Sequence, residues 1–425
     1  MIKLFDSSKK NYRKKLLTFL EKRRHGKEID TQIVSKILKD IKKNKTKALL
    51  KYEKKFSNNS SIVSSKKEID QAIRRLDPKV RKAIDFVYNK ILNFHKKQLV
   101  NLNNIYYRDK FNNKLEYRTV PISRIGIYTP SGLPTSLLMT AIVARLANVK
   151  SIFLATPKTN GELNSAIMYV AKKTGIKSIL NCGGAQAIAA LAYIKKVHKI
   201  VGPSNVWGSE AKRQLSGKII GTEAMYAGES EICVIADKKT DINQIVSSLI
   251  SQAEHSLGSQ SILITKDREV IIKVKKEIPK VLKNLPRKKI AAKSLKNNCI
   301  IIKAKSDKDI VDSVNLIAPE HLEINVKNYS KYFNFIVNAG SIMCGENSAM
   351  VFTDFGTCGI NHSLPTHGSA RFSSGLNINE FIKKISVVTL SKLGVEKIAN
   401  QAITLAEYEE LKGHALSIKS RIRSK

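Results

Sequence analysis

An amide and an imidazole lie three residues apart in the run SQAEH at 251–255. On a helix, residues at this spacing share one face, so Gln252 and His255 could both reach one metal ion. Solvated polar residues at the end of a helix are the simpler interpretation, and the spacing alone favours it. Gln252 and His255 are therefore candidate ligands whose role depends on the rest of the chain.

A carboxylate is adjacent to an imidazole in the run APEHL at 318–322. Glu320 and His321 together offer a base that works near neutral pH and a second proton acceptor. The alternative is the start of a surface helix with Pro319 near its first position, and these residues alone favour that alternative.

Two further groups of polar residues follow. Asp354 and His362 flank a Gly-containing segment, a kind of loop that often carries function, although a polar surface loop is the alternative. Near the end of the chain, Glu409 and His414 are five residues apart and would not point the same way on one helix. A solvated helix face is the simpler interpretation of that pair.

Glycine-containing turns follow three short apolar runs, at YTPSG (128–132), CGGAQ (182–186) and GPSN (202–205). In an open parallel sheet, ligands bind at the carboxyl ends of the strands. Glycine lets the backbone approach a phosphate there, and the start of a helix favours an anion. Ordinary strand-to-helix turns also need glycine, and the chain lacks the G-x-G-x-x-G dinucleotide fingerprint.

The elements that would position these residues alternate between strand and helix from about residue 124, a pattern that predicts parallel β-α-β units. The expected strands are 125–129, 151–156, 178–181, 198–201, 232–236, 261–265, 299–303 and 335–337. The expected helices are 135–147, 162–173, 185–194, 241–255, 267–283 and 307–317. Residues 1–120 are expected to be helical apart from a loop at 57–65, and the helical tail 377–425 must pack on something.

Composition limits the class of protein. The chain has 425 residues and a formal net charge of +40. A nucleic-acid partner would explain that charge, but Lys predominates over Arg throughout the chain, which favours compositional bias, and we expect no nucleic acid. No apolar run approaches the roughly 18 residues of a membrane span. Five scattered cysteines and no signal peptide favour a reducing, cytoplasmic location.

Taken in order, these segments resemble the histidinol dehydrogenase family, from about residue 120 to the end and more weakly before it. The matching runs are GGAQAIAAL (183–191), GPSN (202–205), EAKRQ (210–214), AGESE (227–231), SQAEH (251–255), PEHL (319–322) and NHSLPT (361–366). The resemblance implies an NAD-dependent, zinc-requiring enzyme that oxidises L-histidinol through histidinal to L-histidine in two hydride transfers.

The resemblance also implies roles for particular residues. One zinc ion per subunit would be held by Gln252, His255 and Asp354 of one subunit and by His414 of the other subunit of a homodimer. His321 would be the general base, and Glu320 would activate water for the second oxidation. Besides the metal ligands, substrate would contact Ser230, Glu320, His362 and Glu409. NAD would contact Tyr128, Gln186 and Asn205.

The implied fold is α/β: two Rossmann-like domains with parallel sheets, a helical N-terminal region and a helical C-terminal tail exchanged in the dimer. The expected parts are an N-terminal helical segment (1–24), a discontinuous domain with the metal and catalytic residues (25–123 and 230–376), an NAD-binding domain (124–229) and the tail (377–425).

This chain departs from the family pattern at several positions. Asp354 precedes His362 by eight residues instead of seven, Glu229 replaces a proline, and the Tyr128 loop is shorter than usual. Cys358 lies in the loop between Asp354 and His362 and is a possible substitute ligand. A specificity pocket can change with a few contacts, so a paralogue acting on another amino alcohol or polar diol is the alternative.

Overall fold

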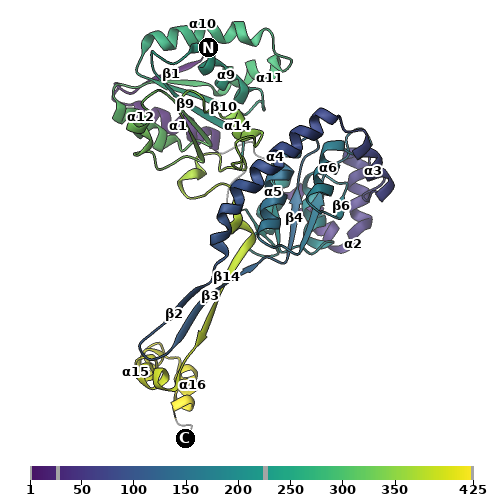
Figure 1. The fold of residues 1–425 in the computed structure, drawn as a ribbon, viewed down its shortest axis with the longest axis vertical. Helices are drawn as coiled ribbons and strands as arrows, with labels where there is room; N and C mark the ends of the chain where they lie inside the picture. The colour runs from purple at the N-terminus through teal and green to yellow at the C-terminus, as the bar shows by residue number, and fades with distance from the viewer. Residues whose placement is uncertain (1, 25–28, 224–227, 423–425) are drawn as a thin grey trace.

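Two parallel β-sheets form the cores of two α/β bodies, in a computed structural model that describes residues 2–24, 29–223 and 228–422 (Figure 1). The start of the AGESE run, at Ala227, lies outside the described residues. The first body has a six-stranded sheet in the order β1-β11-β10-β9-β12-β13, and every pair of neighbours is parallel. Its strands are β1 (Lys3–Asp6), β9 (Glu231–Ala236), β10 (Gln260–Thr265), β11 (Ile300–Lys303), β12 (His321–Asn325) and β13 (Ser341–Cys344).

Helices cover both faces of this sheet, which is why β9, β10 and β12 are buried along their whole length. One face packs on α9 (Ile242–Ala253), α10 (Arg268–Leu282) and α11 (Lys288–Asn298). The other packs on α1 (Tyr12–Arg24), α12 (Asp307–Ile317) and α13 (Ser330–Phe333). The short α14 (Val351–Asp354) follows β13.

The second body has a five-stranded parallel sheet in the order β6-β5-β4-β7-β8. Its strands are β4 (Arg124–Tyr128), β5 (Ser151–Ala155), β6 (Ser178–Leu180), β7 (Lys199–Val201) and β8 (Gly221–Thr222). One face packs on α3 (Lys66–Arg74), α4 (Pro78–Lys96), α5 (Pro134–Leu146) and α6 (Ser165–Lys173). The other packs on α2 (Thr31–Ser57), α7 (Gly184–Tyr193) and α8 (Val206–Leu215).

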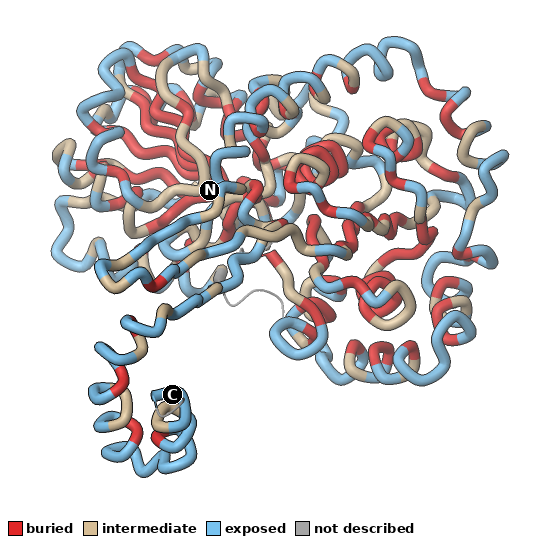
Figure 2. The backbone as a smooth tube through the Cα atoms, turned by 60° about the horizontal axis from the view of Figure 1, so that its bottom comes forward, coloured by how far each residue is buried: buried red, intermediate tan, exposed pale blue. Residues whose placement is uncertain are grey.

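A long arm projects from the second body (Figure 1). It consists of the antiparallel strands β2 (Ile105–Arg108), β3 (Lys114–Pro121) and β14 (Ile382–Thr389), followed by α15 (Lys392–Tyr408) and α16 (Lys412–Ile422). Short 3₁₀ turns at Lys97–Leu102, Ser369–Arg371 and Ile378–Phe381 complete the described elements. Figure 2 shows that the arm is mostly exposed, whereas both bodies have buried interiors.

The parallel α/β prediction is confirmed, but the predicted division into parts is wrong. Residues 1–24 are not a separate helical segment, because β1 pairs with β11 and α1 packs on the first sheet. Residues 31–96 do not join 230–376. Their apolar stripes, such as Val34, Ile37 and Ile41 on α2, pack on the second body. An amphipathic stripe indicates that one face of a helix is buried, but it does not indicate which sheet covers that face.

Three local predictions are also wrong. Residues 105–121 contain two strands, and the tail 377–425 begins with a 3₁₀ turn and β14 before it becomes α-helical. The strand predicted at 335–337 is absent and β13 begins at Ser341 instead. The loop predicted at 57–65 is confirmed to within one residue, between α2 and α3. None of the described helices combines the length and apolar character needed to cross a membrane.

Candidate active site between the two parallel sheets

Most of the predicted catalytic and metal-binding residues gather at the amino-terminal edge of the six-stranded sheet. His321 is the first residue of β12, Glu231 is the first residue of β9, and Ser341 is the first residue of β13. Ser230 immediately precedes β9, and its carbonyl accepts a hydrogen bond from Gln260 N at 3.0 Å. Helix α9 returns from the far edge and so delivers Gln252 and His255 to this same edge.

The Glu320–His321 segment is not the start of a helix. Helix α12 ends at Ile317, Ala318 adopts a left-handed conformation as its C-cap, and Pro319 follows. A proline just after a C-cap is common because it cannot continue the helix. Both Glu320 and His321 are buried, so the surface-helix alternative is excluded.

The His321 imidazole lies between two carboxyl groups. Its Nε2 is 3.5 Å from Asp354 Oδ1 and 3.7 Å from Glu320 Oε1, and its Nδ1 is 3.2 Å from the Ser341 hydroxyl. Burial lowers the pKa of His321 to about 4, because a charged imidazolium would lose its hydration. His321 is therefore neutral at pH 7 and able to accept a proton.

Burial has the opposite effect on the Glu320 carboxyl. Loss of hydration raises the pKa of Glu320 well above its ordinary value, and the hydrogen bond from Glu231 N–H to Oε2, 2.8 Å long, opposes that rise. The nearby Glu231 and Asp354 carboxylates raise the pKa of Glu320 further. Glu320 thus holds a proton more firmly than an ordinary glutamate.

Asp354 at the end of α14 connects His255 and His362 to this cluster. Its Oδ2 is 3.3 Å from His255 Nε2, and its backbone carbonyl is 2.6 Å from His362 Nδ1. Burial alone raises the pKa of Asp354, but the His255 hydrogen bond and the surrounding imidazoles outweigh it, so the net pKa is lowered. Because a carbonyl only accepts, His362 Nδ1 donates, which leaves its Nε2 to accept from Ser136 Oγ at 2.9 Å.

Gln252 is fully buried, yet among the described residues neither its amide oxygen nor its amide nitrogen has a hydrogen-bond partner. A buried amide without partners costs about 1–3 kcal/mol, so such groups usually await a ligand or serve a function. His255 follows in the continuing turn, where its N–H donates to the Gln252 carbonyl at 3.2 Å, and its side chain is half exposed.

Amide oxygen, imidazole and carboxylate are donors that zinc accepts, so Gln252, His255 and Asp354 fit a metal site. Within 2–24, 29–223 and 228–422, no three His, Cys, Asp or Glu side chains are grouped so that they could hold a metal ion by themselves. A metal ion at this place would need the Gln252 amide and a further ligand.

Two predicted residues are not brought to this site within one chain. Glu409 and His414 lie on the arm, at the end of α15 and in α16, and both are exposed. Figure 1 shows these helices at the far end of the arm from both sheets. The solvated-helix interpretation describes them correctly in the single chain.

The predicted cofactor residues lie at the carboxyl edge of the five-stranded sheet. Tyr128 ends β4, and its hydroxyl accepts a hydrogen bond from Gly184 N–H at 3.2 Å. The Gln186 amide donates to Glu53 Oε1 at 2.8 Å, and Asn205 caps α8 by accepting from Gly208 N–H at 3.0 Å. These side chains are engaged within the chain, so they fix the shape of the turns that a ligand would meet.

The two edges face one another across a direct contact. The Asn361 amide donates to the Met139 carbonyl on α5 at 2.9 Å, and His362 meets Ser136 on the same helix. Helix α5 begins just beyond the carboxyl end of β4. The site therefore lies between the amino edge of one sheet and the carboxyl edge of the other.

Several residues at the site were not predicted from the sequence: Arg23, Glu53, Ser136, Glu231 and Ser341. Glu231 lies inside a matched run, and that position was the only available signal. Arg23, Glu53 and Ser136 reach the site through contacts with residues more than 100 positions away, which no local pattern reveals.

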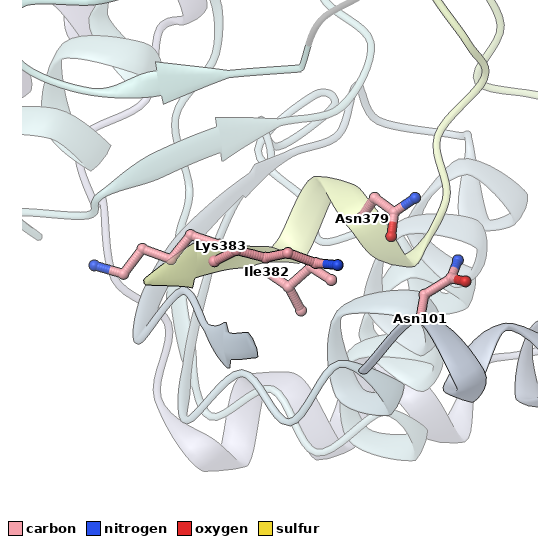
Figure 3. A pocket seen from close by; sticks show the side chains of 5 residues that line it. Asn101, Asn379, Ile382 and Lys383 are labelled. Atoms are coloured by element: carbon pink, nitrogen blue, oxygen red, sulfur yellow. The ribbon is translucent and has the colours of Figure 1, made fainter. Parts of the chain in front are cut away.

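A hollow of about 350 Å³ lies elsewhere, at the base of the arm. It is lined by Asn101, Asn379, Ile382, Lys383 and Lys384. Figure 3 shows the two asparagine amides near one another, with Lys383 extending away from them. The hollow contains no acid–base pair and no metal-type donor set, so it is not the catalytic site.

Two α/β bodies with buried acid–base groups and metal-type donors where they meet define a two-domain α/β enzyme. Residues 21–422 match the sequence pattern of the histidinol dehydrogenase family. The histidinol dehydrogenase of Pelagibacter ubique (strain HTCC1062) is 49% identical over the full length of both chains, and that of Lactiplantibacillus plantarum is 36% identical over 91% of this chain and 92% of the relative. The crystal structure of histidinol dehydrogenase from Elizabethkingia anophelis has a TM-score of 0.91 at 34% identity and covers 100% of this chain and 98% of that one.

The chain belongs to the histidinol dehydrogenase family. It is therefore an NAD-dependent oxidoreductase of histidine biosynthesis.

Proposed function

We propose that this chain oxidises L-histidinol to L-histidine through histidinal, in two hydride transfers to NAD⁺. The observation that carries the proposal is the His321 cluster: a neutral buried imidazole between Asp354 and Glu320. Such a cluster places two distinct proton-transfer groups, both buried, at one sheet edge, as two successive oxidations require. At the same sheet edge lies the buried Gln252 amide, which has no partner among the described residues.

Zinc would be held by Gln252, His255 and Asp354 of one subunit. When bound, the ion would act as a Lewis acid that orients the substrate through its imidazole and amine. The lowered pKa of Asp354 favours the carboxylate form, which would coordinate a cation.

His321 would remove the proton of the substrate alcohol while the bound cofactor accepts the hydride. The lowered pKa of His321 leaves the imidazole unprotonated at neutral pH but makes it a weaker base than an ordinary histidine. Its contact with the Ser341 hydroxyl fixes the orientation of the ring. Neighbouring Asp354 would stabilise the imidazolium that forms when the proton is taken.

Glu320 would activate the water that adds to the aldehyde before the second oxidation. A carboxyl with a raised pKa is a stronger base once it has lost its proton, so the burial of Glu320 favours this role. Burial also keeps the aldehyde away from bulk water, which suits an intermediate that must be oxidised before it escapes.

NAD would lie along the carboxyl edge of the five-stranded sheet. There Tyr128, Gln186 and Asn205 shape the turns, and glycines allow close approach. Gly202 has φ +113°, and a Cβ there would clash with the Tyr128 carbonyl, so this turn requires glycine.

The arm supports a homodimer with composite sites. Its large apolar side chains are unusually exposed, for example Tyr106 at 71%, Tyr408 at 86% and Leu416 at 66%. Exposed apolar groups gathered in one region mark an interaction surface. A second copy of the chain would cover them, and His414 of the partner subunit would supply the missing metal ligand while Glu409 of the partner subunit contacts substrate.

Incubation of purified, zinc-loaded protein with L-histidinol and NAD⁺ tests the proposal. We expect two NADH for every histidine formed, and no NADH when histidinol is omitted. The absence of NADH from the metal-loaded protein would reject the proposed function.

A second candidate is a paralogue that oxidises another amino alcohol or polar diol. Glu229 favours it, because this exposed carboxylate lies beside Ser230 and accepts a hydrogen bond from Ser256, the residue after His255. Rates with histidinol, other amino alcohols and polar diols separate the two candidates, because a strong preference for histidinol would exclude the second one.

A further inference from the structure

Arg23, on the last turn of α1, joins segments of the site that are far apart in the sequence. Its Nη1 forms an ion pair with the Glu231 carboxylate, and its Nη2 donates to the carbonyls of Glu229 at 3.1 Å and Gly258 at 3.3 Å. The ion pair is nearly buried, with side-chain exposures of 11% for Arg23 and 4% for Glu231.

Each segment that Arg23 contacts carries a residue of the proposed site. Glu231 N–H donates to Glu320 Oε2 at 2.8 Å and so holds that carboxyl in place. Gly258 belongs to the turn that follows His255, and Glu229 precedes Ser230. The Glu231 carboxylate also accepts from His367 N–H at 3.2 Å, which ties in the loop after Asn361 and His362.

Stability is a poor explanation for this arrangement. A buried ion pair gains little net free energy, because the desolvation of both charges offsets their attraction. What the guanidinium offers is geometry: a planar fork that can bond in several directions at once, which a lysine ammonium does not reproduce. The contacts of Arg23 are spread over three such directions.

We propose that Arg23 is a positioning residue that holds the Glu320 carboxyl in register through Glu231, and that it acts chiefly on the oxidation of the aldehyde. Its link to the turn after His255 is a single contact with a backbone carbonyl, so the metal ligand depends on Arg23 less than Glu320 does. The proposal rests on the proposed function, because it assigns Glu320 to the water that adds to histidinal. His321 is held by Ser341 and Asp354 without passing through Arg23, so the oxidation of the alcohol depends on it much less.

The test compares Arg23→Met and Arg23→Lys with the matched control Lys22→Met, which removes an exposed cation from the neighbouring position on α1. Rates with histidinol and with histidinal are measured separately, and the NADH formed per histidinol consumed is counted with semicarbazide present to trap free aldehyde. A misplaced catalytic group commonly costs about 100-fold. We expect Arg23→Met to slow histidinal oxidation by about 10- to 100-fold, and histidinol oxidation by less than about threefold.

The NADH count should fall from two toward one in Arg23→Met, while Lys22→Met keeps two. Arg23→Lys should recover only part of the loss, since it keeps the charge but not the fork. A variant that was merely less stable would lose both oxidations together and keep a count of two, and that result would overturn the proposal.

Two further outcomes are distinguishable. If the wild-type protein forms no NADH from histidinol, the proposed function is rejected, independently of the results with the Arg23 variants. If Arg23→Met fails to fold, Glu231→Gln decides the matter: it keeps the backbone N–H to Glu320 and the acceptor for Arg23 but removes the charge. A smaller loss confined to histidinal oxidation supports the proposal, and equal loss of both oxidations overturns it.

Discussion

The two sheet edges that meet at the site are prepared for ligands in different ways. At the carboxyl edge of the five-stranded sheet, Tyr128, Gln186 and Asn205 are all hydrogen-bonded within the chain. At the amino edge of the six-stranded sheet, the Gln252 amide has no partner and the His255 side chain is half exposed. The three cofactor candidates are thus held by their own chain, although Thr129 Oγ1, Thr156 Oγ1 and Asn181 Oδ1 at the same edge have no partner among the described residues. At the other edge the candidate ligand Gln252 is itself without a partner among the described residues.

This difference indicates how the two ligands would be bound. Turns fixed by internal hydrogen bonds present a preformed surface, so a cofactor can bind and leave with little rearrangement. An unpartnered buried amide costs free energy until it binds something, which suits a metal ion that stays. The catalytic candidates Glu320 and His321 lie at the amino edge of the six-stranded sheet, the same edge as Gln252.

The largest effect on activity should come from removal of the proposed base, His321, at the amino edge of the six-stranded sheet. His321→Ala should lower kcat for histidinol oxidation by about 10³-fold, because a positioned proton acceptor contributes about 10²–10⁴-fold. Steady-state rates with saturating NAD⁺ measure the change. His198→Ala, an exposed histidine hydrogen-bonded to Ser123, is the control and should keep its rate. Equal rates in the two variants would remove His321 from the chemistry.

The contrast between the edges can be tested directly with two glutamine substitutions. Gln252→Leu should abolish tight metal binding, yet raise the free energy of unfolding of the metal-free protein by about 1 kcal/mol, because a buried unpaired amide disappears. Gln186→Leu should lower it by about 1–3 kcal/mol, because Glu53 loses a partner. Urea unfolding and metal analysis of both proteins measure these changes.

Changes in stability of the same sign for both variants would mean that the two edges do not differ as described. Retention of stoichiometric metal by Gln252→Leu would remove that residue from the ligand set.

At the carboxyl edge of the five-stranded sheet, loss of the Glu53 side chain should weaken cofactor binding. Glu53 Oε1 accepts from Gly183 N–H at 3.0 Å and from the Gln186 amide. Glu53→Ala should therefore raise KM for NAD⁺ about tenfold, the effect of losing a hydrogen bond or two, with little change in kcat. Glu53→Gln keeps an acceptor oxygen and is the matched control. A fall in kcat at unchanged KM would contradict this assignment.

The smallest effect is expected at Cys358. This exposed cysteine lies in the loop between Asp354 and His362, where the sequence leaves a substitute metal ligand open. Cys358→Ser should change activity by less than about twofold, as is usual for surface substitutions. Loss of bound zinc from this variant would make the thiolate a ligand after all.

The sequence predicts the parallel strands and most helices because each has its own apolar period, as in β9 and α9. It also predicts which residues gather around His321, through short runs that resemble a known family. It does not predict that a buried strand begins at His321, directly after Glu320, because a proline beside polar residues is equally typical of a helix start. The placement of α2, the ion pair of Arg23 with Glu231 and the contact of Glu53 with Gly183 depend on long-range packing that no local pattern encodes.

The most direct test mixes two inactive variants, His414→Ala and His321→Ala, and lets their subunits exchange so that mixed dimers form. If His414 serves the opposite subunit, each mixed dimer holds one intact site, and random pairing in a two-fold dimer should restore about a quarter of wild-type activity. No activity in mixed dimers whose formation has been verified would contradict the account, because it would mean that His321 and His414 must come from the same chain.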